Sequence, residues 1–279
     1  MTLEDPPSLR ETLKKYEIVP DKKFGQNFIF DQNITDKIAR SAGPLNAQTV
    51  IEIGPGPGGL TRSLLRNGAR KVIAIEVDNR CLPILEELRK VVGDRLEIIH
   101  QDALEVKCEE LGEAPRKIVA NLPYNIATPL LFNWLPHIHA FESLTLMFQK
   151  EVADRIKAAP STSAYGRLSV MVQKVAYVGQ LFDLPPEVFT PSPKVSSSVI
   201  QLMPRPEIVP GKLYQALEIV VKAGFSQRRK MLRSSLRGLD LKDLNQVFQN
   251  LGLPLTARAE ELTVDDFTEI AKAYLKEHQ

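Results

Sequence analysis

The stretch Asn121-Leu122-Pro123-Tyr124 has the side chains for chemistry on an aromatic amine. The exocyclic amine of adenine is a poor nucleophile, because its lone pair is delocalised into the ring. The Asn121 side-chain oxygen and the Leu122 carbonyl can accept its two N–H groups and favour a pyramidal nitrogen, whose lone pair points at a sulfonium methyl group. Pro123 fixes the turn, and Tyr124 offers a ring on which a flipped-out base can stack. We therefore expect methyl transfer to adenine here, a plain strand-to-helix turn being the alternative.

A glycine-rich turn lies within residues 49–65, TVIEIGPGPGGLTRSLL. A β-branched run precedes the turn and an apolar pattern of helical period follows it, as in the first unit of a doubly wound α/β sheet. Glycine lets the backbone approach a ligand closely, since a Cβ would occupy the ligand's space. The stretch therefore predicts a site for an adenine-bearing cofactor. Its glycines are Gly54, Gly56, Gly58 and Gly59.

The glycine turn matches two cofactor motifs. Through Gly54, Gly56 and Gly59 it reads as G-x-G-x-x-G, the dinucleotide fingerprint, which alone is a weak signal. From Glu52 to Gly58 it reads as E-x-G-x-G-x-G and resembles the first motif of S-adenosylmethionine-dependent methyltransferases. In that family the loop wraps the amino-acid end of the cofactor and needs no pyrophosphate cradle. Residues further along the chain must decide between the two cofactors.

Two acids lie at or just after the ends of the next two predicted strands. Glu76 lies near the end of the strand 71–77, about 20 residues past the glycine turn, where such folds place an acid on the ribose hydroxyls. Asp102 follows the strand 96–100 and is the natural acceptor for the adenine amino group of the cofactor. A solvated loop acid is the alternative for Glu76, and a helix N-cap is the alternative for Asp102.

Strands alternate with helices as far as residue 203, which implies a parallel sheet covered on both faces. We expect an α/β, Rossmann-like methyltransferase sheet. Residues 165–178 are ambiguous between helix and strand, and 181–184 with 195–203 could close the sheet with a hairpin-like edge. The other predicted strands are 49–53, 117–120 and 143–148, and the predicted helices include one near 128–135 and one at 151–158.

A domain boundary is expected at residues 203–211, MPRPEIVPG, because prolines and a glycine cluster there. We therefore assign 1–205 to a catalytic domain, with an N-terminal lid segment at 1–45, and 206–279 to a small all-helical, RNA-binding domain. In the lid segment, the capping box Ser8-x-x-Glu11 begins a short helix, and 31–42 forms another that Gly43 ends. The loop 21–31 between them suits a lid over a polar ligand or, alternatively, packs its phenylalanines on the core.

A basic cluster follows the proposed boundary, where we predict helices at 213–223 and 227–237. Arg229, Arg233 and Arg237 recur at i, i+4 and i+8, so they would share one helix face. A solvated face is the usual interpretation of such a run. Here the like charges would repel unless an anion meets them, which favours RNA phosphate. The candidate RNA-binding residues are Lys222, Arg228, Arg229, Lys230, Arg233 and Arg237.

The composition is that of an ordinary globular protein of 279 residues, with 43% hydrophobic and 25% charged residues. The net charge is only +2, so affinity for nucleic acid must come from a local patch. Cys81 and Cys108 form no C-x-x-C, which indicates a reducing compartment, and four scattered histidines lack metal-ligand spacing. Without an apolar signal region or a membrane-length segment, we expect a cytoplasmic monomer that binds neither metal nor membrane.

The order of motifs resembles the KsgA/RsmA family of small-subunit rRNA adenine dimethyltransferases over roughly residues 22–236. The motifs are KFGQNF, IEIGPGPGGLT, AIEVD, QDAL, NLPYNIATPLL, FTPSPKVSSSVI and FSQRRKMLRSSL. The resemblance implies transfer of methyl groups from S-adenosylmethionine to N6 of two adjacent adenosines near the 3′ end of 16S rRNA, in the small subunit or its precursor. Ser196 departs from the family, which more often has an acid after Pro-Lys-Val.

The resemblance also implies roles for individual residues. Phe189, in an F-x-P motif, would be the second stacking face for the target base, beside the 121–124 motif. The residues that would contact the cofactor are Asn27, Ile29, Gly54, Gly56, Glu76, Asp102 and Asn121.

Four alternatives stay open at this point. An Erm-like enzyme methylates large-subunit rRNA and shares most motifs, although PSPKVSSSVI and the helical tail favour the small subunit. A DNA adenine methyltransferase usually has a larger recognition domain. An NAD-dependent oxidoreductase fits the glycines and Glu76 but leaves Asn121–Tyr124 and the basic cluster without a role. A non-catalytic RNA-binding assembly factor would not need an intact 121–124 motif.

Overall fold

The computed structural model describes residues 7–21, 25–227, 230–241 and 244–278. The chain divides into two compact units, one of Met1–Ala153 with Gly179–Pro204 and the other of Asp154–Val178 with Arg205–Gln279. The division after Pro204 lies within one residue of the expected boundary. Asp154–Val178, however, belongs with the C-terminal helices and not with the first 205 residues as expected, because its helix α7 (Arg167–Val175) packs on α8 (Gly211–Gly224) and α11 (Val264–Glu277).

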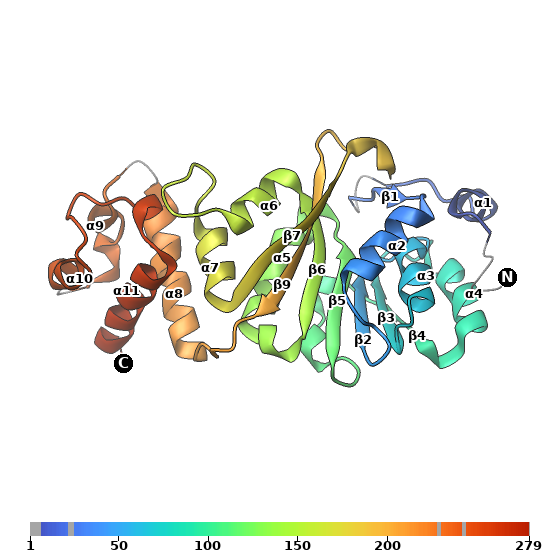
Figure 1. Ribbon diagram of the computed structural model, residues 1–279, viewed down its shortest axis with the longest axis horizontal. Helices are drawn as coiled ribbons and strands as arrows, with labels where there is room; N and C mark the ends of the chain where they lie inside the picture. Colours follow the sequence, from blue (N-terminus) through green and yellow to red (C-terminus); the bar gives the residue numbers. More distant parts are fainter. Residues whose placement is uncertain (1–6, 22–24, 228–229, 242–243, 279) are drawn as a thin grey trace. The chain divides into compact units, whose positions relative to one another are not determined.

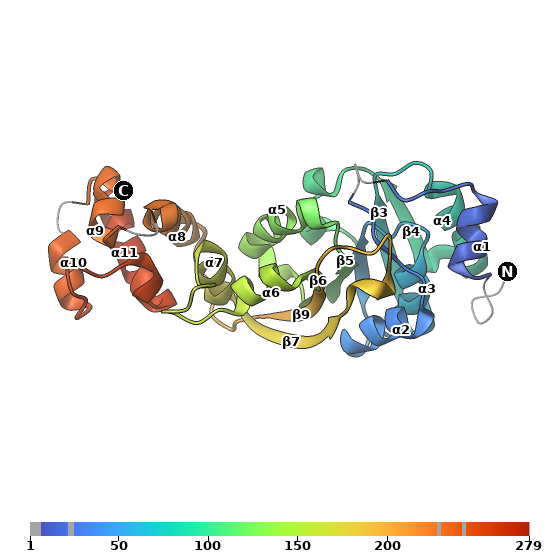
Figure 2. The same ribbon diagram turned by 90° about the horizontal axis from the view of Figure 1, so that it is seen from above.

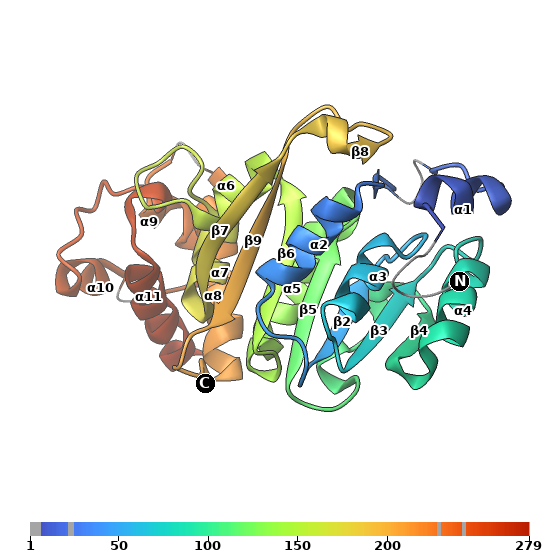
Figure 3. The same ribbon diagram turned by 45° about the vertical axis from the view of Figure 1, so that its right-hand side comes forward.

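A mixed seven-stranded sheet lies at the centre of the first unit, in the order β4-β3-β2-β5-β6-β9-β7 (Figure 1). Strands β4, β3, β2, β5 and β6 are parallel, whereas β9 is antiparallel to β6. The long strands β9 and β7 form the edge that the sequence predicted (Figure 3). The strands are β2 (Thr49–Ile53), β3 (Lys71–Glu76), β4 (Leu96–His100), β5 (Arg116–Asn121), β6 (Ser143–Gln149), β7 (Ala176–Leu184) and β9 (Ser197–Pro204).

Helices cover both faces of this sheet. Helices α2 (Gln32–Ser41) and α3 (Gly59–Arg66) lie on one face and α5 (Tyr124–Trp134) on the other (Figure 2). Every residue of β2 is buried, which is the pattern of a parallel strand between two helical layers. The expected Rossmann-like α/β fold is confirmed. The remaining helices here are α1 (Leu9–Lys15), which begins with the Ser8–Glu11 capping box, α4 (Leu82–Val92), and α6 (Lys150–Lys157), which crosses the division after Ala153.

The strand order reverses at the centre of the sheet, where β3 lies on one side of β2 and β5 on the other. In open α/β sheets, ligands bind at the carboxyl ends of the strands beside such a reversal. A short antiparallel pair adds to this end of the sheet: β1 (Phe28–Ile29) from the N-terminal segment pairs with β8 (Phe189–Thr190). The fold thus brings the N-terminal segment together with the ends of β2, β3 and β5.

The C-terminal unit is built from helices around an aromatic core. The Phe225 ring contacts those of Tyr165 and Phe267, with centroids 6.1 and 5.5 Å apart. The segment 165–178, ambiguous in the sequence, is helix α7 followed by the start of β7. The other helices of this unit are α9 (Leu232–Ser235) and α10 (Leu244–Asn250). Within the described part of the chain, no helix is long and apolar enough to cross a membrane.

The single helix expected at 227–237 is wrong. Met231 is extended, with φ −60° and ψ 139°, and α9 begins only after it. The cause is tertiary, because the Leu232 N–H donates to the Ala257 carbonyl at 2.8 Å, and the Leu232 and Leu236 side chains are fully buried. The i, i+4, i+8 argument for the basic residues therefore does not hold.

Candidate active site

One cavity opens at the carboxyl ends of β2, β3, β4 and β5, with about 940 Å³ of empty space including its mouth. Small-molecule sites commonly measure about 300–1,000 Å³. The cavity brings together all seven cofactor-contact residues inferred from the sequence, together with Leu122, Pro123 and Tyr124. Residues separated by up to 97 positions in the chain, from Asn27 to Tyr124, thus share one site.

The glycine turn is shaped by its own backbone and by protein neighbours. Gly54, Gly56 and Gly58 have φ of 63°, 52° and 82°, a left-handed region that favours glycine. A Cβ at Gly56 would clash with the Phe28 ring at 2.8 Å, whereas one at Gly54 would be in ordinary van der Waals contact with Pro123 at 3.5 Å. Gly56 thus makes room for the Phe28 ring, whereas Gly54 is favoured by its positive φ.

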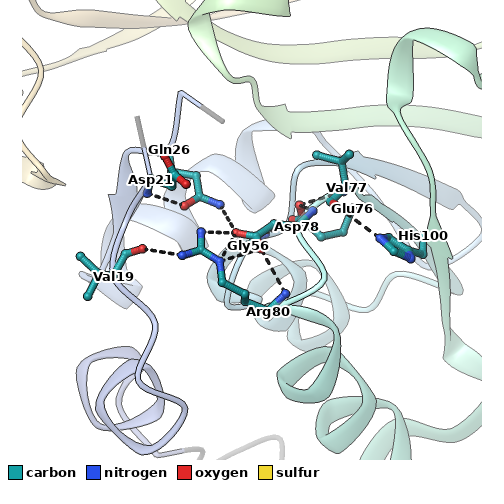
Figure 4. A network of polar contacts seen from close by, with 9 residues as sticks. All are labelled: Val19, Asp21, Gln26, Gly56, Glu76, Val77, Asp78, Arg80 and His100. Carbon is teal, nitrogen blue, oxygen red and sulfur yellow. Dashed lines mark hydrogen bonds and ion pairs between the residues drawn. The ribbon is translucent and has the colours of Figure 1, made fainter. Parts of the chain in front are cut away.

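Glu76 is buried at the end of β3 and accepts three backbone hydrogen bonds (Figure 4). Its Oε2 accepts the Gly56 N–H at 2.8 Å, and its Oε1 accepts those of Val77 and Asp78 at 2.9 and 2.8 Å. Burial raises the pKa of Glu76, and these hydrogen bonds oppose the rise. Glu76 therefore anchors the glycine turn as well as facing the cavity.

Glu52 is a second buried carboxyl group of the cavity and is not among the site residues predicted from the sequence. It is 2% exposed, and its Oε2 has no hydrogen-bond partner among the described residues. Burial, with the nearby charge of Glu76, raises the pKa of Glu52 to about 8. Its signal was an acid inside the apolar run VIEI of a central strand, where an ionisable side chain is costly unless it has a use.

The charged residues that line the cavity are all acidic. Among its described lining residues these are Glu52, Glu76 and Asp102, without any lysine or arginine. A pyrophosphate would meet no basic side chain among these described residues, whereas a ligand that carries sulfonium and ammonium charges would be attracted and would favour ionisation of Glu52. The orphaned Glu52 oxygen, deep in the cavity, also favours a hydrogen-bond donor or cation there. The cavity fits S-adenosylmethionine better than a nicotinamide dinucleotide.

Asn121, at the end of β5, lines the cavity on the side opposite Glu76 and β3. Its Nδ2 donates to the Asn27 carbonyl at 3.1 Å. Tyr124 begins α5, earlier than the expected start near 128, and its hydroxyl is hydrogen-bonded to the Ser197 Oγ at 2.6 Å. Burial raises the pKa of Tyr124. This ring is therefore neutral and held in place at the cavity wall.

Two predicted site residues have additional or different surroundings. The Asp102 Oδ1 accepts the Leu104 N–H at 2.9 Å, so this acid lines the cavity and also caps a short 3₁₀ turn. Phe189 does not line the cavity. It pairs with Ile29 across the β1–β8 ladder and is only 3% exposed within a hydrophobic cluster. In this structure its ring presents no face on which a base could stack.

The basic cluster belongs to the C-terminal unit. Lys222, Lys230, Arg233 and Arg237 are exposed, and no ion pair joins them to another described residue. Arg228 and Arg229 lie outside the described residues. No group of histidine, cysteine, aspartate or glutamate side chains in the described ranges could hold a metal ion.

Comparison with known proteins places these features in a family. The family model described as "Ribosomal RNA adenine dimethylase" matches residues 20–276. The protein named ribosomal RNA small subunit methyltransferase A from Rhodospirillum rubrum is 52% identical over 96% of this chain and 92% of its own length. The protein of the same name from Xanthobacter autotrophicus is 51% identical over 98% of this chain and 95% of its own length.

Solved structures agree with this likeness. A dimethyladenosine transferase from Plasmodium falciparum is 28% identical, with a TM-score of 0.75, and the match covers 87% of this chain and 95% of that one. The 23S rRNA methyltransferase ErmE is 26% identical, with a TM-score of 0.65, and the match covers 88% of this chain and 99% of that one.

Proposed function

Since the chain belongs to the ribosomal RNA adenine dimethylase family, we propose that it methylates N6 of two adjacent adenosines in the 3′-terminal hairpin of 16S rRNA, with S-adenosylmethionine as methyl donor. The relatives that are about half identical over nearly the whole chain are named as small-subunit enzymes. The likeness to the large-subunit enzyme ErmE is lower, at 26% identity. The small subunit is therefore the favoured substrate.

The observation that carries the proposal is the acidic cavity with Asn121 at one wall and Glu76 at the other. S-adenosylmethionine supplies an electrophilic methyl group when bound. Glu76 would hold the ribose, since a carboxylate oxygen can accept more than one hydrogen bond and, within the described ranges, its Oε2 accepts only the Gly56 N–H. Asp102 would accept the adenine amino group, and Glu52 would meet the cationic end of the donor. The glycine turn, Asn27 and Ile29 would complete the pocket.

Asn121 and Leu122 would act on the target amine. The Asn121 amide nitrogen is already taken by the Asn27 carbonyl, which leaves the side-chain oxygen as the end available to an amine. With the Leu122 carbonyl, that oxygen would accept both N–H groups and favour the pyramidal geometry of the reacting nitrogen. Tyr124 would stack on the base, which must leave its helix to enter the cavity.

The C-terminal unit would bind rRNA phosphates through its exposed basic residues. Their side chains have no described acidic partner, so a polyanion can neutralise them without breaking an internal ion pair. Lys222, Lys230, Arg233 and Arg237 carry this part of the proposal, and Arg228 and Arg229 extend it from the sequence. We expect the protein to act as a cytoplasmic monomer.

The test is incubation with radiolabelled S-adenosylmethionine and unmethylated small subunits, followed by identification of the labelled nucleoside. Labelled N6,N6-dimethyladenosine at adjacent positions is the expected product. Large subunits in a parallel reaction test the Erm-like alternative. Label in 23S rRNA alone, or no transfer with either subunit, would overturn the proposal.

A further inference from the structure

Residues 25–29 contact both walls of the cavity. The Asn27 carbonyl accepts the Asn121 amide on the β5 side at 3.1 Å. On the other side, the Phe28 ring lies only 2.8 Å from the position that a Cβ at Gly56 would take. Gly25 is as tightly enclosed, since a Cβ there would lie 2.6 Å from the Asn125 side-chain oxygen. Whatever holds this segment therefore also determines where the Asn121 side chain lies.

Phe28 and Ile29 at the end of this segment pair with β8, whereas the part before them is held through the side chain of Gln26. Its Nε2 donates to the Asp78 Oδ2 at 2.8 Å, and its Oε1 accepts the Asp21 N–H at 2.9 Å (Figure 4). Both ends of this amide are thus engaged. The Asp78 carboxylate is only 1% exposed, so the hydrogen bond from Gln26 is shielded from water.

Asp78 is itself fixed by Arg80, two residues further along (Figure 4). The Arg80 Nη2 lies 2.6 Å from the Asp78 Oδ2, and its Nε lies 2.9 Å from the Oδ1. A further guanidinium nitrogen donates to the Val19 carbonyl at 3.2 Å. Burial raises the pKa of Asp78, but the hydrogen bonds from Arg80 and Gln26 outweigh it and hold the pKa below its usual value. Asp78 is therefore an ionised, fixed anchor for Gln26.

The Asn27 carbonyl decides which way the Asn121 amide faces. A carbonyl oxygen only accepts hydrogen bonds, so it selects the NH₂ end of the amide and turns the oxygen away. Acceptance of the target N–H groups needs that orientation. If residues 25–29 shifted, the Asn121 amide would be free to rotate, and part of the population would present its nitrogen to the amine.

We propose that Asp78 and Gln26 are positioning residues for methyl transfer, which act on Asn121 through the Asn27 carbonyl. The proposal rests on the proposed function. It gives a role in the chemical step to an Asp–Arg pair that follows closely after the ribose-binding acid. Cofactor affinity should change little, because the Glu76 carboxylate keeps its three backbone donors when the Asp78 side chain alone is altered.

The test uses Asp78→Asn and a rescue by Gln26→Glu in the same chain. In Asp78→Asn the single oxygen stays at the Oδ1 position, where the Arg80 Nε and backbone N–H donate, and the new NH₂ takes the Oδ2 position. There it faces the Gln26 Nε2, donor to donor, so this hydrogen bond is lost. We expect single-turnover methylation at saturating S-adenosylmethionine to fall about 10- to 100-fold, with affinity for S-adenosylhomocysteine within about threefold of wild type. Amide hydrogen exchange at residues 25–29 should accelerate. With Gln26→Glu added, the amide NH₂ at position 78 can donate to the new carboxylate at position 26. The double variant should therefore recover most of the methylation rate and most of the protection from exchange.

Asp36→Asn is the matched control, since it breaks another mostly buried Asp–Arg pair, with Arg66 at 3.4 Å, outside the cavity lining. It should leave the rate and the exchange at residues 25–29 unchanged. Gln26→Leu serves if Asp78→Asn does not fold, with the same loss expected. A wild-type rate in the folded single variant, or no recovery in the double variant, would overturn the positioning role alone. A wild type that transfers no label would instead remove the proposed function.

Discussion

The cavity and the basic cluster of the C-terminal unit hold their ionisable side chains in opposite ways. In the cavity, Glu52 and Glu76 are nearly inaccessible to water, and Glu76 is fixed by three backbone donors. In the basic cluster, residues such as Arg233 and Arg237 are exposed, and neither has an ion-pair partner among the described residues.

The difference indicates two kinds of recognition. Fixed, buried charges discriminate by geometry, and each contributes strongly because the surroundings are poorly polarisable. Exposed charges attract any polyanion, contribute little each, and are screened by salt. Substitutions in the cavity should therefore have large and specific effects, whereas those in the basic cluster should have small, additive and salt-dependent ones.

The largest effect is expected at Asn121. Asn121→Ala should slow single-turnover methylation by about 10²–10³-fold, by analogy with the removal of one oxyanion-hole donor. Asn121→Asp should lose about as much, because a carboxylate oxygen would face the Asn27 carbonyl in place of the amide N–H. Affinity for S-adenosylhomocysteine, measured by calorimetry, should fall far less. An Asp variant with near wild-type turnover would show that the amide orientation does not matter.

Glu52 should make the stability of the free protein depend on pH. Its pKa is about 8 in the folded state and 4.5 in a model peptide, so between these values the folded state binds one more proton. The free energy of unfolding then falls as pH rises, by up to about 1.4 kcal/mol per unit, and levels off above about pH 8. Glu52→Gln lacks this dependence.

Urea denaturation at pH 5, 6, 7 and 8 measures the effect. From pH 6 to 8 the free energy of unfolding of Glu52→Gln should rise relative to wild type by up to about 2.7 kcal/mol, which is two units of that slope. Below about pH 4.5 both states bind the proton, so the two curves run parallel there. Parallel curves for the two proteins would mean that the Glu52 carboxylate is ionised in the folded state at neutral pH.

Glu76→Ala should weaken cofactor binding by about 1.5–3 kcal/mol, the contribution of charge-assisted hydrogen bonds. The structure adds a second consequence, since the Gly56 N–H loses its acceptor and the glycine turn its anchor. We therefore expect a lower melting temperature as well as weaker binding of S-adenosylhomocysteine in calorimetric titration. Unchanged affinity in a folded variant would remove Glu76 from the cofactor site.

The cavity could be predicted from sequence because strand-end position depends on local patterns. The β-branched runs before Gly54 and Glu76 define parallel strands, and parallel strands bring their carboxyl ends to one edge. What could not be predicted are contacts between segments far apart in the chain. The Asn27–Asn121 hydrogen bond and the burial of Phe189 depend on how the β1–β8 pair packs, for which a single sequence carries no signal.

The basic cluster shows a different limit. The spacing of its arginines indicated one helix, but the backbone is determined by the residues that become buried. Leu232 and Leu236 turn into the core of the C-terminal unit, and Ala257, distant in sequence, takes the Leu232 N–H. Charge spacing predicts a shared face only if the helix is continuous, and the extended Met231 breaks it.

The smallest effect is expected in the basic cluster, with Arg233→Glu and Arg237→Glu together. If both side chains neutralise phosphates, subunit binding should weaken, and the log–log slope against salt should flatten by about 0.7–0.9 for each phosphate that is no longer neutralised. Cofactor affinity and the melting temperature should stay at wild-type values, because these exposed side chains have no described ion-pair partner. Two acids of the same unit that could have paired with these arginines are engaged elsewhere. Asp266 caps α11 through Thr263, and Glu261 accepts the Arg258 N–H. Filter binding across salt concentrations, run beside a melting curve, separates RNA binding from internal ion pairing. If the two arginines formed ion pairs within the protein, the double variant would lose thermal stability, and the salt dependence of its subunit binding would stay unchanged.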